Sequence, residues 1–102
     1  MMAAYKLRFH PKFVFDLSAA IAWYEEISNF TCTKFKSATN RQLKLIKKNP
    51  YSRSVRYDEI RFARIPKFPY AIHYSIDAES NSVLVYRLLS DSRDPAANWV
   101  RI

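Results

Sequence analysis

Two neighbouring segments, residues 70–76 and 83–89, constrain the fold of this chain more than any other feature. In the first, aromatic and β-branched residues recur at every second position: Tyr70, Ile72, Tyr74 and Ile76. This period of two predicts a strand with one face toward a core. The second segment, VLVYRLL, is apolar on nearly both faces, which predicts a strand inside a sheet. The polar residues AESNS between them are long enough for a hairpin, so we expect the chain to be organised around an antiparallel sheet.

The region before this hairpin predicts one strand and a first helix. Residues 4–10 alternate weakly between apolar and polar side chains, which indicates a strand, and Pro11 then favours a helix start. The next apolar residues recur at helical spacing and form one stripe: Phe13, Leu17, Ala20, Ile21, Tyr24 and Ile27. Trp23 borders the stripe, and we expect Trp23 and Tyr24 to lie in the core or at its margin.

A second helix is expected after a break at residues 29–33, with Thr31 or Thr33 as its cap, and it should end at Asn49-Pro50. The residues expected on its buried side share one face of the helix: Cys32, Phe35, Thr39, Leu43 and Ile46. Its opposite side is basic and carries Lys34, Arg41, Lys44 and Lys48.

The region between this helix and the hairpin predicts a further strand at residues 57–65, in which Ile60 and Phe62 share one face and Arg61 points the other way. The order of elements is then β-α-α-β-β-β. We therefore expect an α+β fold, in which a helical hairpin packs on one face of a mainly antiparallel four-stranded sheet. Residues 1–102 are expected to form a single domain, since no linker or repeat interrupts them.

The composition excludes several kinds of site. The chain has no glycine, which excludes the glycine-rich phosphate loops of Rossmann and P-loop proteins and leaves its turns to Asn, Asp, Ser or Pro. One cysteine and two histidines far apart in the sequence offer no metal-ligand cluster, so we expect neither metal nor cofactor. Cys32 cannot form an internal disulfide, and its place on an apolar helix face is typical of inert packing.

The net charge of +8 is distributed unevenly. No acidic residue occurs from Ser28 through Tyr57, whereas eight Lys and Arg residues do. Such a field favours nucleic acid or an acidic protein as a partner, although a run of charge is more often a solvated face. No apolar run is long enough for a membrane helix, and we expect a soluble, cytoplasmic protein without membrane contact.

The sheet face away from the helices is the place where chemistry could occur. The polar and aromatic candidates for this face and its rim are Arg61, Lys67, His73, Arg87, Arg93 and Trp99. Arginines and a histidine on one surface could cleave an RNA phosphodiester without metal, by proton transfer and by stabilising the phosphorane charge. The alternative is that His73 is a surface or satisfied residue. Arg87 lies in a strand of Val and Leu, so it needs a polar partner or a functional surface.

The order of these segments resembles one known family. A helix with WYE, a basic helix ending in NP, then KFPYAIHYSID, VLVYRLL and SRDPAANWVR are similar in order and spacing to the RelE/ParE superfamily of type II toxin–antitoxin toxins, and most to its ParE-like, plasmid-stabilisation members. The resemblance spans nearly the whole chain. It implies the same β-α-α-β-β-β fold, and it implies a cognate antitoxin that is a small, acidic, DNA-binding protein.

The resemblance leaves two functions open. ParE-like members poison DNA gyrase, whereas RelE-like members are ribosome-dependent mRNA endonucleases. The arginine that RelE-like enzymes carry in the third strand corresponds here to Ala71, and their late tyrosine falls near Trp99. The endonuclease alternative would use Arg61, Arg64, His73 and Arg93. A gyrase poison, which we favour, is expected to bind its target through Arg87, Arg93 and Trp99, and either toxin would bind its antitoxin or a polyanion through Lys34, Arg41, Lys44 and Lys48.

Overall fold

Two long antiparallel strands, β4 (Tyr70–Asp77) and β5 (Ser82–Ser90), form the middle of a twisted sheet in the computed structural model, which describes residues 5–90. Within those residues the strand order is β1-β5-β4-β3-β2. The edge strand β1 runs parallel to β5, and the other pairs are antiparallel. The remaining elements are β1 (Lys6–Phe9), α1 (Pro11–Ile27), α2 (Asn29–Lys48), η1 (Pro50–Ser52), β2 (Val55–Tyr57) and β3 (Ile60–Arg64).

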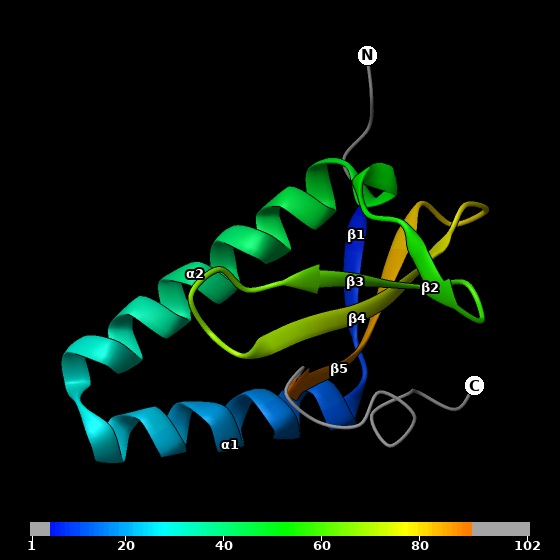
Figure 1. Cartoon of the computed structure of the whole chain (residues 1–102). Helices are drawn as coiled ribbons and strands as arrows, with labels where there is room; N and C mark the ends of the chain where they lie inside the picture. Colours follow the sequence, from blue (N-terminus) through cyan, green and yellow to red (C-terminus); the bar gives the residue numbers. More distant parts are fainter. Residues whose placement is uncertain (1–4, 91–102) are drawn as a thin grey trace.

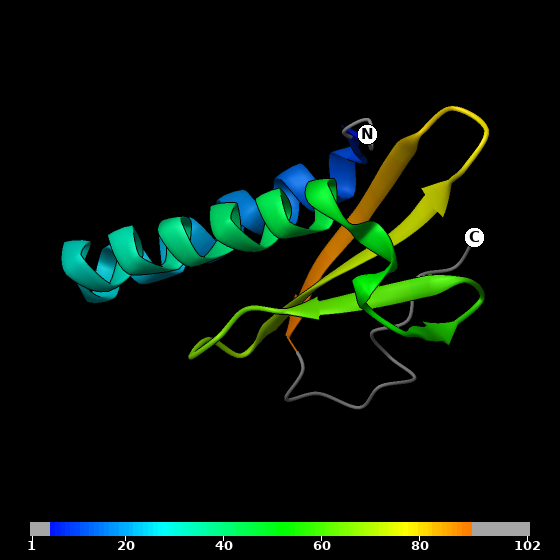
Figure 2. The same ribbon diagram turned by 90° about the horizontal axis from the view of Figure 1, so that it is seen from above.

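The two helices form a hairpin on one side of the sheet (Figures 1 and 2). The predicted α+β class and the interior position of β5 are confirmed, and the predicted element order holds except for one additional strand. The predicted number of four strands is wrong, because five strands pair among the described residues. The strand expected at residues 57–65 is divided by a two-residue turn at Asp58 and Glu59, whose φ angles are 42° and 65°. Such a turn, with positive φ at both central residues, matches the twist of a hairpin.

The helical hairpin is connected more tightly than we expected. Pro11 begins α1, and the His10 side chain accepts a hydrogen bond of 3.0 Å from the Lys12 amide. Ser28 is the single residue between the helices. Its amide donates to the Tyr24 carbonyl, and its hydroxyl accepts from the Thr31 amide at 3.2 Å. Ser28 therefore caps both helices, and the expected break at residues 29–33 with a threonine cap is wrong.

The core lies between the helical hairpin and the sheet. Phe35 of α2 is fully buried, and its ring lies 4.8 Å from that of Tyr24 and 5.2 Å from that of Phe68. Cys32 is buried, as predicted. Two residues of α1 differ from the expectation: Trp23 is 60% exposed and Ile27 is 59% exposed. Trp23 lies beside the buried face of α1, which Phe13, Ala20 and Tyr24 supply, and Ile27 is the last residue of the helix.

Candidate functional site

An extra residue in β5 determines which side chains reach the open face of the sheet. His73 pairs with Arg87, but the next residue, Tyr74, pairs with Val85, so that Tyr86 is bulged out of the ladder. Val85 and Leu88 are consequently both buried in the core, although three positions separate them. Without the bulge, strict alternation would place Arg87 on the same side as Val85. The bulge therefore moves Arg87 out of the core and Leu88 into it.

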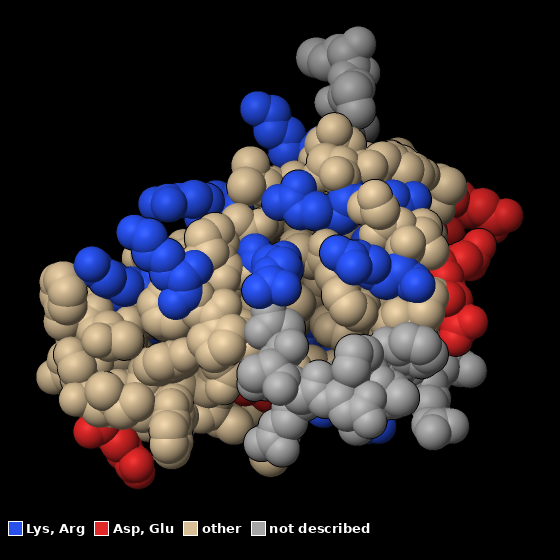
Figure 3. Space-filling view, viewed as in Figure 1, with Lys and Arg blue, Asp and Glu red and all other residues tan. Residues whose placement is uncertain are grey.

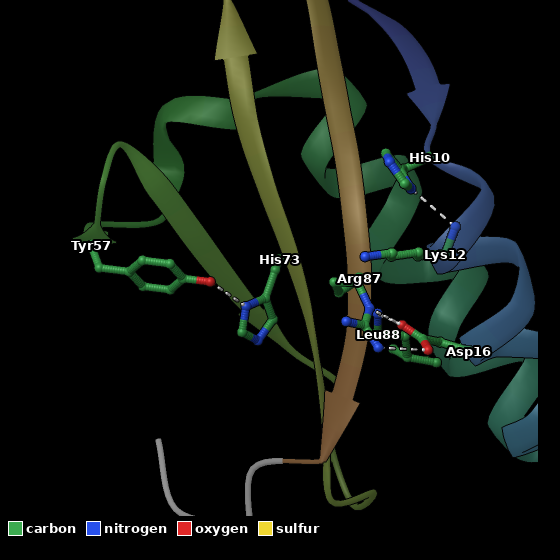
Figure 4. A network of polar contacts seen from close by, with 7 residues as sticks. All are labelled: His10, Lys12, Asp16, Tyr57, His73, Arg87 and Leu88. Carbon is green, nitrogen blue, oxygen red and sulfur yellow. Dashed lines mark hydrogen bonds and ion pairs between the residues drawn. The ribbon is translucent and has the colours of Figure 1, made fainter. Parts of the chain in front are cut away.

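Arg87 forms a bidentate ion pair with Asp16 of α1 (Figure 4). Its Nε donates to Asp16 Oδ2 at 2.7 Å, and its Nη2 donates to Oδ1 at 3.1 Å. The same carboxylate accepts a hydrogen bond of 3.1 Å from the Leu88 amide. Strand β1 ends at Phe9, so this amide lies beyond the segment of β5 that β1 pairs with. Hydrogen bonding to Asp16 is the main cause that raises the pKa of Arg87.

His73 lies beside this ion pair on β4, but it is not an exposed residue. Its side chain is 3% exposed, and its Nδ1 lies 3.2 Å from Tyr57 Oη (Figure 4). The ring also packs on Phe62, with 3.9 Å between the ring centroids. Burial lowers the pKa of His73 to about 4, the positive charge of Arg87 contributes in the same direction, and Asp16 opposes them. His73 is therefore neutral at pH 7. The expectation that its side chain is exposed is wrong.

Arg61 lies on the opposite side of the sheet from His73. It pairs across the strands with Tyr74, and its Nη1 donates to the Arg53 carbonyl. Its guanidinium also lies 5.3 Å from the ring centroid of Tyr51. Tyr74 Oη donates a 2.7 Å bond to the Pro50 carbonyl, so both side chains hold the segment after α2 against the sheet. The expectation that Arg61 belongs to the open face is therefore wrong.

Arg64 and Phe62 share the face of β3 on which His73 lies, since Phe62 pairs with His73 and Arg64 pairs with Ala71. Arg64 is exposed, and the guanidinium of Arg56 lies 5.6 Å from the Phe62 ring centroid. Of the residues predicted for RNA cleavage, the structure thus brings Arg64 and His73 to one face and Arg61 to the other. Arg93 and Trp99 lie outside the described residues.

The basic side of α2 is exposed, as the sequence predicts. Basic side chains form a band over α2 that continues toward the strands, and acidic side chains gather at the end of α1 and at the opposite edge of the molecule (Figure 3). The exposed residues predicted for this side are Lys34, Arg41, Lys44 and Lys48. Lys34 and Arg41 also line a groove of about 300 Å³ between α2 and the β3–β4 turn, and Lys67 lines it from the other side. The groove brings together cations from distant parts of the sequence.

Two residues of the polar network were missed in the sequence, namely Asp16 and Tyr57. Asp16 had a detectable signal, because an arginine inside an apolar strand requires an acidic partner, and Asp16 lies within a helix that must pack against that sheet. The role of Tyr57 had no such signal in the sequence, because its contact with His73 depends on the turn that folds β2 back onto β3.

Among residues 5–90, no three His, Cys, Asp or Glu side chains lie close enough together to hold a metal ion. None of the helices in that range is sufficiently long and apolar to cross a membrane.

Comparison with known proteins gives one family and one fold. Residues 7–95 match the model of the ParE toxin of type II toxin–antitoxin systems, parDE. A chain of the chromosomal ParDE TA system from P. aeruginosa is 15% identical, with a TM-score of 0.72 over 85% of this chain and 96% of that one. A chain of the toxin–antitoxin complex RelBE2 from Mycobacterium tuberculosis is 18% identical, with a TM-score of 0.60 over 91% and 98%. At these identities the solved structures show a common fold, and no curated protein sequence matches significantly.

Proposed function

The chain belongs to the family of ParE toxins of type II toxin–antitoxin systems, and from this premise we propose that it inhibits growth by binding DNA gyrase. One observation carries the choice of gyrase over RNA: among residues 5–90, the groups predicted for RNA cleavage do not all lie on one face of the sheet. Arg61 lies on the helix side of the sheet, and His73 is buried on the other side. The proposal also implies a cytoplasmic protein.

Phosphodiester cleavage needs a base, an acid and cations around one phosphate. His73 packs on Phe62 and has Tyr57 at its Nδ1, so neither a substrate hydroxyl nor a leaving oxygen has direct access to that nitrogen. The guanidinium of Arg87, its neighbour across the strands, is bound to Asp16. At the third-strand position where RelE-like enzymes carry an arginine, this chain has Ala71. The loss of one such charge-stabilising group typically costs about 10²–10³ in rate.

The second function, ribosome-dependent mRNA cleavage, has one observation in its favour. The sheet face away from the helices combines aromatic rings with cations, because Phe62 contacts both Arg56 and His73 and shares its face with Arg64. Stacking platforms flanked by positive charge are typical of surfaces that bind single-stranded RNA. The mRNA and ribosome therefore remain the alternative target.

We further propose a small, acidic antitoxin as the partner of the basic side of α2. Helix α2 carries six exposed Lys and Arg residues and no acid, and four of these cations share one side of the helix. Complementary charge of this kind accelerates association and selects the partner. The two solved structures with the same fold come from systems in which a toxin is paired with an antitoxin, as their descriptions say.

The test separates the two targets within the same cells. Expression of the wild-type chain is expected to cause DNA breaks and to leave ribosome-bound mRNA uncut. The variant His73→Gln, which keeps a polar side chain but cannot exchange a proton, is expected to remain toxic, whereas Arg93→Ala should relieve toxicity. If mRNA cuts appear and His73→Gln abolishes them in a folded protein, the endonuclease function is the correct one. Purified gyrase and translation extracts then give the same distinction in vitro.

A further inference from the structure

The outer face of α1 carries large apolar side chains that are mostly exposed to solvent. Phe15 is 74% exposed and Trp23 is 60% exposed, and Ala19 between them is exposed as well. Aromatic residues of this size usually lie in cores or in interfaces, where they contribute much of the binding energy. A helix face of this composition is therefore a surface for a partner.

These exposed residues belong to a second stripe on the outside of α1, which has one charged residue at each end. With about 100° between successive residues, the side chains of Lys12, Phe15, Ala19, Trp23 and Glu26 fall within about 80° on the outside of α1. Lys12 and Glu26 are both exposed. Successive residues of this set are three or four positions apart, which is the spacing found on a helix that packs along another helix.

The stripe is complementary to itself when it is reversed. Lys12 and Glu26 are each seven residues from Ala19, and Phe15 and Trp23 are each four residues from it. If two copies of α1 cross antiparallel at Ala19, every Lys12 faces a Glu26 and every Phe15 faces a Trp23 of the other copy. A small residue at the crossing lets the helices approach closely. We propose that α1 is a two-fold symmetric interface between two copies of this chain, which is the commonest symmetry of a homodimer.

The charge of α1 favours a second copy over an acidic partner. Helix α1 contains one lysine and three acidic residues, a net charge of −2, whereas α2 contains six basic residues and no acid, a net charge of +6. An acidic protein is therefore attracted to α2 far more than to α1. In the antiparallel pair, by contrast, the two opposite charges at the ends of the stripe are matched. An interface of one helix from each copy is small, so we expect a weak dimer that dissociates on dilution.

The test is a charge-swap series followed by sedimentation velocity over a wide range of concentrations of the purified full chain. The wild type is expected to self-associate, and Ala19→Arg is expected to abolish the dimer. Lys12→Glu and Glu26→Lys should each raise its dissociation constant about tenfold, because every substitution affects both symmetry-related pairs. The double variant with both changes restores opposite charges across the interface, so its dissociation constant should return to that of the wild type.

Lys36→Glu is the matched control, because Lys36 is an exposed residue of α2 and its reversal changes the net charge by the same amount as Lys12→Glu. This control should leave the dimer unchanged. A wild type that stays monomeric at every concentration, or a double variant that is not restored, would overturn the proposal. The proposal also fails if the wild type is monomeric while Ala19→Arg prevents binding of the antitoxin, since the stripe would then be the antitoxin's surface. None of these outcomes depends on the toxin's target.

Discussion

Asp16 makes contacts with residues that lie 71 and 72 positions away in the sequence. Its carboxylate binds the Arg87 guanidinium twice and the Leu88 amide once, so that α1 is attached to the end of β5. The side chain of Asp16 is 11% exposed, and that of Arg87 is 31% exposed. An ion pair at this depth is only partly screened by water, and the removal of one partner leaves the other without its compensating charge.

We expect Asp16→Asn to lower the free energy of unfolding by about 2 kcal/mol, because it weakens two charge-assisted hydrogen bonds and leaves Arg87 unpaired. Urea unfolding at pH 7 measures the change. Glu25→Gln, which neutralises an exposed acid on the same helix, is the control and should change stability by less than about 0.5 kcal/mol. Equal effects of the two substitutions would contradict the structural role of Asp16.

The lowered pKa of His73 leads to a second prediction, namely that the folded protein loses stability in mild acid. Its pKa is about 4 in the folded protein against about 6.5 in an unfolded chain, so only the unfolded state takes up a proton between these values. Stability should therefore be complete above pH 6.5 and should fall by about 2 kcal/mol on acidification to pH 5. Urea unfolding of the wild type and of His73→Gln across this range isolates the contribution. A similar pH dependence in both proteins would mean that His73 does not cause it.

At the scale of elements, the turns are unusual because the chain folds without glycine. Four residues among those described have positive φ: Asp58, Glu59, Lys67 and Asn81. Asn and Asp tolerate this conformation, but a long side chain such as that of Lys67 does so at a cost of about 1–2 kcal/mol. The β3–β4 turn has Pro66 at its second position and Lys67, with a φ of 71°, at its third, and the Phe68 amide donates to the Ile65 carbonyl at 3.1 Å. This is a type II turn, which favours glycine at the third position.

Lys67→Gly is accordingly expected to raise the free energy of unfolding by about 1 kcal/mol, since glycine adopts positive φ without a clash. Thermal and urea unfolding provide the measurement. Lys67→Ala removes the same charged side chain but retains a β-carbon, and it should bring no such gain. If the alanine variant were equally stabilised, the benefit would come from the loss of charge and not from the backbone.

At the scale of the whole molecule, the charge is separated between the two helices, and basic side chains form a band over α2 (Figure 3). Charges at the rim of an interface act mainly on the association rate, through long-range steering that salt screens.

The double substitution Arg41→Glu/Lys44→Glu is therefore expected to slow association with the antitoxin about tenfold or more at low salt, and to make the rate less sensitive to salt. Surface plasmon resonance or stopped-flow fluorescence at several salt concentrations measures both quantities. A control with the same kind of reversal on the exposed edge strand, Lys6→Glu, should have a smaller effect. An association rate that is unchanged by the double substitution would argue against the α2 surface.

Most of the helices and strands, and the α+β class, can be inferred from local patterns in the sequence. Helical spacing and the alternation of apolar residues are local properties, and so are the helix start at Pro11 and the helix end at Asn49-Pro50. The element order then implied an α+β fold, and the exposed basic side of α2 followed from the same periodicity. A turn without glycine offered no comparable signal at Asp58 and Glu59, so the fifth strand was missed.

Which side chains meet depends on the pairing of the strands, and local patterns in the sequence do not reveal that pairing. The bulge at Tyr86 is defined by the pairing of β5 with β4, and it exchanges the faces on which Arg87 and Leu88 lie. A period of two assigns residues to two faces but does not say where one extra residue will shift the pattern, because that depends on the pairing partner. The same limit applies to Arg61 and His73. The alternation within each strand assigns each residue to one of two faces, but only the pairing of β3 with β4 shows that the two residues lie on opposite sides of the sheet.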